Sequence, residues 1–184
     1  PSVAVDEVNH VGEAVAVIVA RSKQAAQDAV ELVDVDYDLL PVVLDMEKAT
    51  AQDPHLCHDH LESNESFNFV FDAGDAGTGV DTEQAFADAD VVVSRRFIQQ
   101  RLIPAFMEPR SVVVDPTAGQ VTVWSATQIP HILRVMLALI TGTPEQQIRV
   151  IAPDVGGGFG GKLQVCPEEI LALPISKVHG AALV

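Results

Sequence analysis

The chain is poor in cysteine, in basic residues and in long apolar runs, and each shortage excludes a class of protein. Its two cysteines, Cys57 and Cys166, are too few for the disulfide framework of a small secreted domain. The 11 basic residues face 26 acidic ones, and the net charge of −15 argues against nucleic acid or an anionic membrane as a partner. No apolar run could cross a membrane and no signal peptide opens the chain, so we expect a cytoplasmic protein without a membrane span.

Glycine, by contrast, is concentrated in one place. Five of the 12 glycines lie within residues 156–161, inside a segment that we call the glycine loop (residues 154–162). Glycine tolerates positive φ and lets a ligand approach the main-chain N–H groups. The apolar residues 148–152 that precede the loop are typical of a buried strand. A glycine-rich loop after a strand is a common cradle for an anionic cofactor.

Three interpretations of the glycine loop compete. Gly156, Gly161 and Lys162 fit a nucleotide P-loop, but Leu163 stands where a hydroxyl group should hold magnesium. The run also fits the dinucleotide pattern, which glycine runs match by accident, and no acidic residue follows about twenty positions later. The third interpretation gives weight to Phe159, a flat apolar side chain between two glycine pairs. The plain alternative is a structural turn that buries Phe159.

The hydrophobic pattern predicts a mixed α+β chain. The apolar run at residues 14–20 predicts a strand, residues 22–33 a helix capped by Ser22, and the alternation at residues 33–37 a second strand. Further on, the apolar segments at residues 111–114 and 120–124 flank turn residues and predict a hairpin.

Two helices are expected after the hairpin. Pro130 favours a helix start and Gly142 a helix end, with an apolar stripe between them. A short helix is expected at residues 167–173, ended by Pro174.

One polar segment carries residue types that bind zinc. His55, Cys57, His58 and His60 are close in sequence. Their spacing fits no zinc finger, and no second pair of ligands lies nearby. We therefore expect a polar connecting loop without a metal.

Three motifs in a fixed order carry a family resemblance. They are Met-Glu-Pro-Arg at residues 107–110, Ser-Ala-Thr-Gln at residues 125–128, and the glycine loop. Together they resemble the large subunit of the molybdenum hydroxylases, the xanthine dehydrogenase and aldehyde oxidase family, and most of all its aerobic carbon monoxide dehydrogenase branch. The resemblance covers about residues 6–173, and the shared order of the motifs makes it more specific than any one of them.

The resemblance implies a domain organisation and a function. Residues 1–50 would be the C-terminal part of an α/β hammerhead domain, residues 51–90 a connecting segment, and residues 91–184 the N-terminal part of a molybdopterin cofactor-binding domain. The chain would then be a fragment of a catalytic subunit that oxidises a small substrate with water as the oxygen source, and would be inactive alone. The alternative is a stand-alone, non-catalytic α/β module for assembly or anion binding.

The resemblance also implies a cofactor site. In the family, the matching glutamine hydrogen-bonds an oxygen ligand of molybdenum, and the matching Phe-Gly pair lies against the metal and its pterin. The implied cofactor-binding residues are Gln128, Gly157, Gly158, Phe159 and Gly160. None of them would be a direct metal ligand, and the catalytic base, a glutamate in the family, is expected downstream of this chain.

Cofactors and partners follow from the same resemblance. The cofactor would be molybdopterin with molybdenum, in its cytosine dinucleotide form, and any copper would belong to the full enzyme. The expected partners are the rest of the large subunit, an FAD-binding medium subunit and an iron–sulfur small subunit.

Three further residues match family positions. Glu108 and Arg110 are expected to form a structural ion pair. Leu163 stands where the purine-oxidising branch has a glutamate, which predicts a small apolar or weakly polar substrate, unless Leu163 faces the core.

Overall fold

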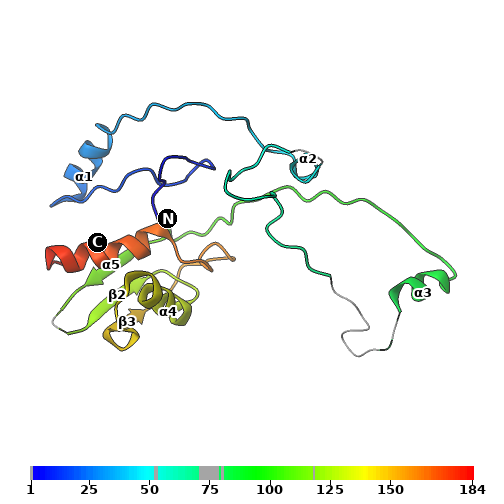
Figure 1. The fold of residues 1–184 in the computed structure, drawn as a ribbon. Coiled ribbons are helices and arrows are strands. Elements are labelled where there is room, and N and C mark those ends of the chain that lie inside the picture. The colour runs from blue at the N-terminus through cyan, green and yellow to red at the C-terminus, as the bar shows by residue number, and fades with distance from the viewer. Residues whose placement is uncertain (1, 52–53, 71–78, 80, 118) are drawn as a thin grey trace. The chain divides into compact units, whose positions relative to one another are not determined.

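The computed structural model describes residues 2–51, 54–70, 79, 81–117 and 119–184. The chain divides into two compact units, one made of Pro1–Asp34 and Arg101–Val184 and the other of Val35–Gln100. The first unit holds a three-stranded sheet in the order β1-β2-β3 (Figure 1). Its elements are α1 (Lys23–Val30), β1 (Val112–Asp115), β2 (Val121–Ser125), α4 (Pro130–Thr141), η1 (Glu145–Gln147), β3 (Ile148–Ile151) and α5 (Pro167–His179).

The sheet combines an antiparallel and a parallel pair. β1 pairs antiparallel with β2, with Val112 opposite Ser125, so the predicted hairpin is confirmed. Residue 118 of its turn lies outside the described residues. β2 pairs parallel with β3, with Trp124 opposite Ile151, and the predicted strand before the glycine loop is confirmed as β3. The C-terminal ends of β2 and β3 therefore meet at one edge of the sheet, where the N-terminal end of β1 also lies.

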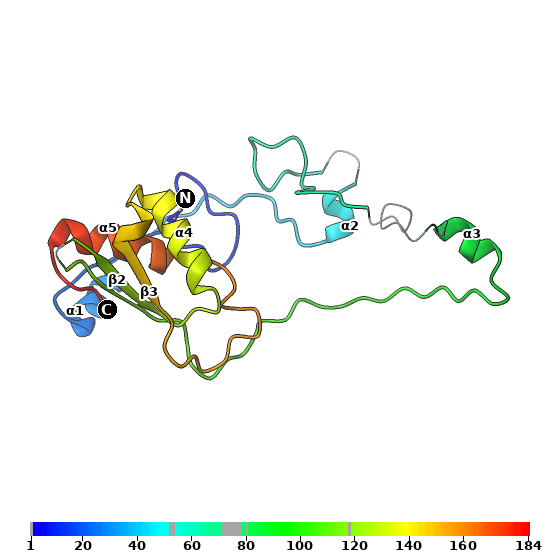
Figure 2. The same ribbon diagram turned by 90° about the horizontal axis from the view of Figure 1, so that it is seen from below.

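Two helices cover one face of this sheet. α4 packs on β3, α5 packs on β1, and the two helices contact each other (Figure 2). α4 begins at Pro130 and ends before Gly142, whose φ of 68° is the left-handed cap that glycine adopts without strain. The sequence prediction for this helix is thus confirmed. The buried core between the helices and the sheet consists of Val114, Val121, Val123, Leu133, Leu137, Ile148 and Leu173.

The prediction that Pro174 ends the last helix is wrong. α5 continues through Pro174 and ends at His179, before Gly180 with a φ of 59°. Proline removes one N–H donor from the helix ladder, but Leu173 and Ser176 on either side are fully buried. Their packing against the core outweighs the loss of one main-chain hydrogen bond.

In the N-terminal segment, the predicted helix is present but the two predicted strands are not. The helix is confirmed as α1, and Ser22 Oγ accepts a hydrogen bond of 3.2 Å from the Ala25 N–H group. The predicted strands at residues 14–20 and 33–37 are wrong, because these segments are extended but form no ladder with any described residue. A strand needs a partner for its N–H and C=O groups, and hydrophobic alternation alone does not supply one.

The second unit contains α2 (Met46–Ala49) and α3 (Thr82–Ala87), joined by long irregular segments. Asn64 organises the polar loop that carries the histidines, since its amide group bonds to Ala49 O, His55 O and Cys57 N at 3.0, 2.8 and 2.8 Å. Among the described residues, no three histidine, cysteine or carboxylate side chains are grouped to hold a metal ion. No helix among all the residues that the structure describes has the length and apolar character needed to cross a membrane.

Candidate functional site

The three sequence motifs converge at one edge of the sheet. Gln128 follows β2, the glycine loop follows β3, and residues 104–110 lead into β1. Because β2 and β3 are parallel and β1 is antiparallel to β2, all three segments reach the same edge. Loops at the carboxyl ends of parallel strands are where α/β proteins usually bind ligands.

Gln128 is hydrogen-bonded to the end of the glycine loop. Its side-chain oxygen Oε1 accepts hydrogen bonds of 3.2 Å from the N–H groups of both Gly160 and Lys162. The main-chain N–H group of Gln128 donates to the main-chain oxygen of Lys162 at 3.1 Å. These bonds fix which end of the carboxamide faces the loop. The amino group Nε2 has no acceptor among the described residues, and Gln128 is exposed.

The glycines of the loop are required by close approach and by backbone conformation. A Cβ atom on Gly158 would overlap the Gln128 side chain. Gly157 and Gly160 have φ values of 93° and 86°, which an L side chain rarely adopts. A Cβ on Gly160 would meet no atom within 4 Å, so the loop is open on that side.

Phe159 lies at the exposed tip of the glycine loop. Its side chain is 74% exposed, so the alternative of a turn that buries it is wrong for the described chain. Its φ of 47° is in the left-handed region, which is uncommon for a non-glycine residue and is found most often at functional sites and tight turns. The loop thus presents an exposed, flat apolar ring two residues before Gly161 and next in sequence to Gly160, whose N–H group is bonded to Gln128.

The predicted ion pair between Glu108 and Arg110 is wrong. Glu108 Oε2 instead accepts hydrogen bonds from Gly156 N at 2.7 Å and from Lys162 Nζ at 3.0 Å. Arg110 Nε pairs with Glu168 Oε1 at 2.7 Å. The chain bends at residues 107 and 108, and each of the two charged side chains is paired with another segment, Glu108 with the glycine loop and Arg110 with the start of α5.

Lys162 is buried by this arrangement. Its side chain is only 1% exposed, and its Nζ atom lies 4.8 Å from the centroid of the Phe106 ring, within cation–π range. The Gly156 N–H and then the Lys162 ammonium lower the pKa of Glu108 below its ordinary value, so the carboxylate is charged at neutral pH. The buried Lys162 side chain therefore has a counter-charge at neutral pH.

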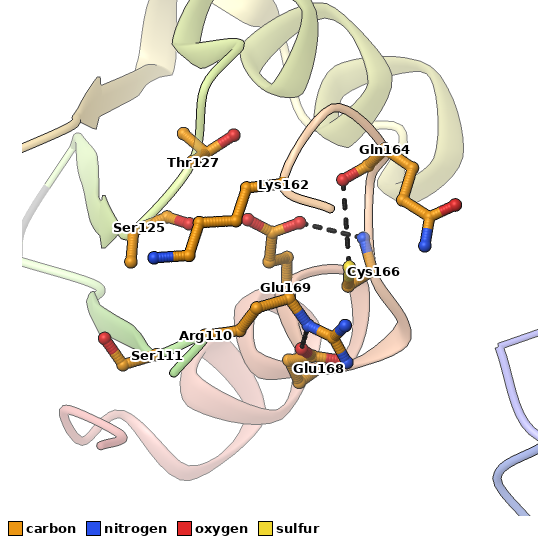
Figure 3. Close-up of a pocket in the computed structure, with 10 residues that line it drawn as sticks. Arg110, Ser111, Ser125, Thr127, Lys162, Gln164, Cys166, Glu168 and Glu169 are labelled. Carbon is orange, nitrogen blue, oxygen red and sulfur yellow. Dashed lines mark hydrogen bonds and ion pairs between the residues drawn. The ribbon is translucent and has the colours of Figure 1, made fainter. Parts of the chain in front are cut away.

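Beside Lys162 lies a small cavity of about 10 Å³ between β2 and α5, and most of the residues that line it are polar or charged (Figure 3). Both oxygens of the buried Glu169 carboxylate are occupied, by Ser125 Oγ at 2.5 Å and by Cys166 N at 2.8 Å. Burial, followed by the nearby Glu168 charge, raises the pKa of the Cys166 thiol. A protonated, buried thiol is a poor nucleophile and metal ligand, so we assign this cluster to the packing of α5 on the sheet.

Comparison with known proteins identifies the family. The model of the molybdopterin cofactor-binding domain matches residues 57–183, and that of the aldehyde oxidase and xanthine dehydrogenase a/b hammerhead domain matches residues 1–41. The chain belongs to the molybdopterin cofactor-binding domain family. The predicted fold class, the end of a hammerhead domain followed by a molybdopterin-binding domain, is confirmed.

Individual relatives of this family cover nearly the whole chain. The carbon monoxide dehydrogenase large chain of Hydrogenophaga pseudoflava is 35% identical over 90% of this chain and 22% of its own length. The nicotine 6-hydroxylase large subunit of Paenarthrobacter nicotinovorans is 38% identical over 97% of this chain and 21% of its own. The chain thus spans about a fifth of the length of these molybdopterin-family relatives.

Solved structures of the family have the same fold. Quinoline 2-oxidoreductase from Pseudomonas putida 86 superimposes with a TM-score of 0.74 at 34% identity, over 89% of this chain and 20% of that one. The carbon monoxide dehydrogenase of Oligotropha carboxidovorans gives 0.72 at 34% identity, over 89% and 21%.

The structure brings together the residues that the sequence predicted for the site, and it adds others. Gln128, Gly158 and Gly160 are in direct contact, and Phe159 projects from the same loop. Sequence reasoning missed Lys162, which it considered only as part of a possible P-loop pattern. The sequence did offer a signal, because Lys162 ends one of the three motifs and the oppositely charged Glu108 belongs to another. The structure joins these two charges.

Proposed function

We propose that this chain forms one wall of the molybdenum cofactor site in the large, catalytic subunit of a molybdopterin-dependent oxidoreductase of the carbon monoxide dehydrogenase type. The observation that carries the proposal is the orientation of Gln128. Two loop N–H groups hold its carboxamide oxygen, so its amino group remains as a donor, and Gly160 of the same loop has open space around it. The family match supports the same assignment.

The residues present fit the cofactor. The free Nε2 donor suits an oxygen ligand of the metal, the flat, exposed ring of Phe159 suits an apolar contact with the cofactor, and Gly160 leaves open the space that a Cβ would fill. Gln128, Gly157, Gly158, Phe159 and Gly160 would hold it, and none would bind the metal directly. When bound, the cofactor supplies the redox centre that takes two electrons from the substrate, with water as the oxygen source. The chain orients this group and keeps bulk water away.

The finer assignments are also proposals. We infer the cytosine dinucleotide form of the cofactor, an FAD-binding medium subunit, an iron–sulfur small subunit, and a downstream segment of the large subunit that carries the glutamate base. Copper would be bound only by that downstream segment. The domain limits at residues 50 and 90 stay part of the proposal. The hammerhead match ends at residue 41, before the first limit, and the cofactor-domain match already begins at residue 57, before the second.

The test is the composition and activity of the full-length large subunit, purified with its partner subunits from a host that makes the molybdenum cofactor. We expect stoichiometric molybdenum and pterin, and oxidation of carbon monoxide, a simple aldehyde or quinoline. In H₂¹⁸O, hydroxylated quinoline should carry the label. A folded protein that contains no molybdenum and oxidises none of these substrates would instead support a non-catalytic module.

A further inference from the structure

A single carboxylate ties the two ends of the glycine loop together. Glu108 Oε2 holds Gly156 N at the start of the loop and Lys162 Nζ at its end, at 2.7 and 3.0 Å. The Phe106 ring lies against Lys162 Nζ. It also fills the space beside Gly161, where a Cβ would come within 2.7 Å of the ring. We call Phe106, Glu108 and Lys162 the loop clasp.

The clasp connects directly to Gln128 through the backbone of Lys162. The N–H group of Lys162 donates to Gln128 Oε1, and its carbonyl accepts from the Gln128 N–H, at 3.2 and 3.1 Å. The side chain of Lys162 is thus anchored to Glu108 while its backbone anchors Gln128. A shift of residue 162 would release both bonds at once, and only the Gly160 N–H group would then hold the Gln128 carboxamide.

The chemistry of the pair points to positioning rather than to stability. Of the two side chains, that of Lys162 is 1% exposed and that of Glu108 is 34% exposed. Removing the carboxylate alone would leave the buried lysine charge without compensation, whereas replacing both charges by neutral groups of similar volume is often neutral for stability. Charge-assisted hydrogen bonds are shorter and stronger than neutral ones, so they hold a geometry more tightly. A buried lysine in an exposed loop is therefore best explained by the geometry that it fixes.

We propose that Glu108 and Lys162 are positioning residues that set the orientation of Gln128 toward the cofactor. Neither touches the cofactor or the substrate in this assignment, and both act through the loop backbone. The inference rests on the proposed function, because it gives the loop clasp its purpose. It also goes beyond that function, because it assigns a role to two residues outside the cofactor contacts.

The decisive variant is the double substitution Glu108→Gln with Lys162→Met in the full-length enzyme. The glutamine introduced at position 108 can still accept from the Gly156 N–H, and the methionine introduced at position 162 keeps most of the length of the lysine stem without its charge. We expect a melting temperature within a few degrees of the parent and parental molybdenum content. We expect kcat to fall about tenfold with KM changed less than about twofold.

A second readout does not depend on activity. In the molybdenum-free enzyme, the amide protons of Gly160 and Lys162 should exchange with solvent about tenfold faster in the double variant than in the parent. These amides are the donors to Gln128 Oε1, so their protection reports its anchoring. The matched control is Arg110→Met with Glu168→Gln, which removes an ion pair from the same segment without touching the loop clasp. The control should keep parental kcat and exchange.

Each outcome decides the proposal. A double variant with parental kcat and parental amide exchange overturns it. If the double variant does not fold, Glu108→Gln alone is measured in the same way, and failure of both to fold shows a purely structural pair, which also overturns it. Failure of the proposed function gives a different result. In that case Gln128→Ala would keep full activity, whatever the amide exchange rates of the glycine loop are.

Discussion

Replacing Gln128 by alanine in the full-length, cofactor-loaded enzyme is expected to lower turnover by about ten- to a hundredfold, the usual loss when a group that orients a metal ligand is removed. The substitution deletes the Nε2 donor, and it also removes the oxygen that accepts from Gly160 and Lys162. Molybdenum content should largely survive, because in the family the pterin has many other contacts. The measurement is kcat together with the metal content of the same preparation.

A glycine variant tests the same claim without altering Gln128. Gly158→Ala should reproduce the loss, because its Cβ would take the space of the Gln128 side chain and displace it. Gln164→Ala is the matched control, since its exposed side chain takes no part in the hydrogen bonds between Gln128 and the loop, so kcat should stay unchanged. Full activity of Gln128→Ala would show that this residue is not at the metal.

Substrate preference is the second large effect, and it depends on Leu163. The side chain is 54% exposed, so it does not face the core of the described chain. It has no donor or acceptor for a polar heterocycle, unlike the glutamate at this place in the purine-oxidising branch. A site that hydrogen-bonds its substrate can discriminate by about 10⁴, and an apolar site cannot. Xanthine should therefore be a poor substrate compared with carbon monoxide, an aldehyde or an aromatic.

The comparison is of kcat/KM for xanthine, a simple aldehyde and carbon monoxide with the full-length enzyme. We expect xanthine to be the poorest of the three, and Leu163→Glu to gain measurable xanthine oxidation. Leu163→Gln is a useful control because it restores polarity without charge. Xanthine as the best substrate of the parent enzyme would contradict this assignment of Leu163.

The parts of the fold that sequence predicted are those whose signals are local. The hairpin and α4 carry turn and cap residues that act within a few positions, and Pro130 and Gly142 are found at the ends where they were expected. The predicted strands at residues 14–20 and 33–37 are absent because a strand needs a partner segment to form a ladder. The local hydrophobic pattern of a segment does not show whether such a partner exists. The prediction that Pro174 ends the last helix is wrong for a related reason. The helix continues because the residues near Pro174 are buried in the core, and burial depends on tertiary packing.

The site follows the same division. Gln128 and the glycine loop could be paired from sequence because each follows a strand, and parallel strands end at one edge of the sheet. The burial of Lys162 could not be predicted, because a lysine beside glycines is normally solvated. Its partner Glu108 lies 54 positions away, and only the packing of the segment before β1 against the loop brings the two charges together.

The central claim is that Gln128 faces the molybdenum cofactor, and the most direct test is one distance. In a structure of the cofactor-loaded, full-length complex, Nε2 of Gln128 should lie about 3 Å from an oxygen bound to molybdenum, within ordinary hydrogen-bond range. Oε1 should remain on the N–H groups of Gly160 and Lys162. A cofactor bound with Nε2 of Gln128 beyond hydrogen-bonding range of every metal ligand would contradict the account.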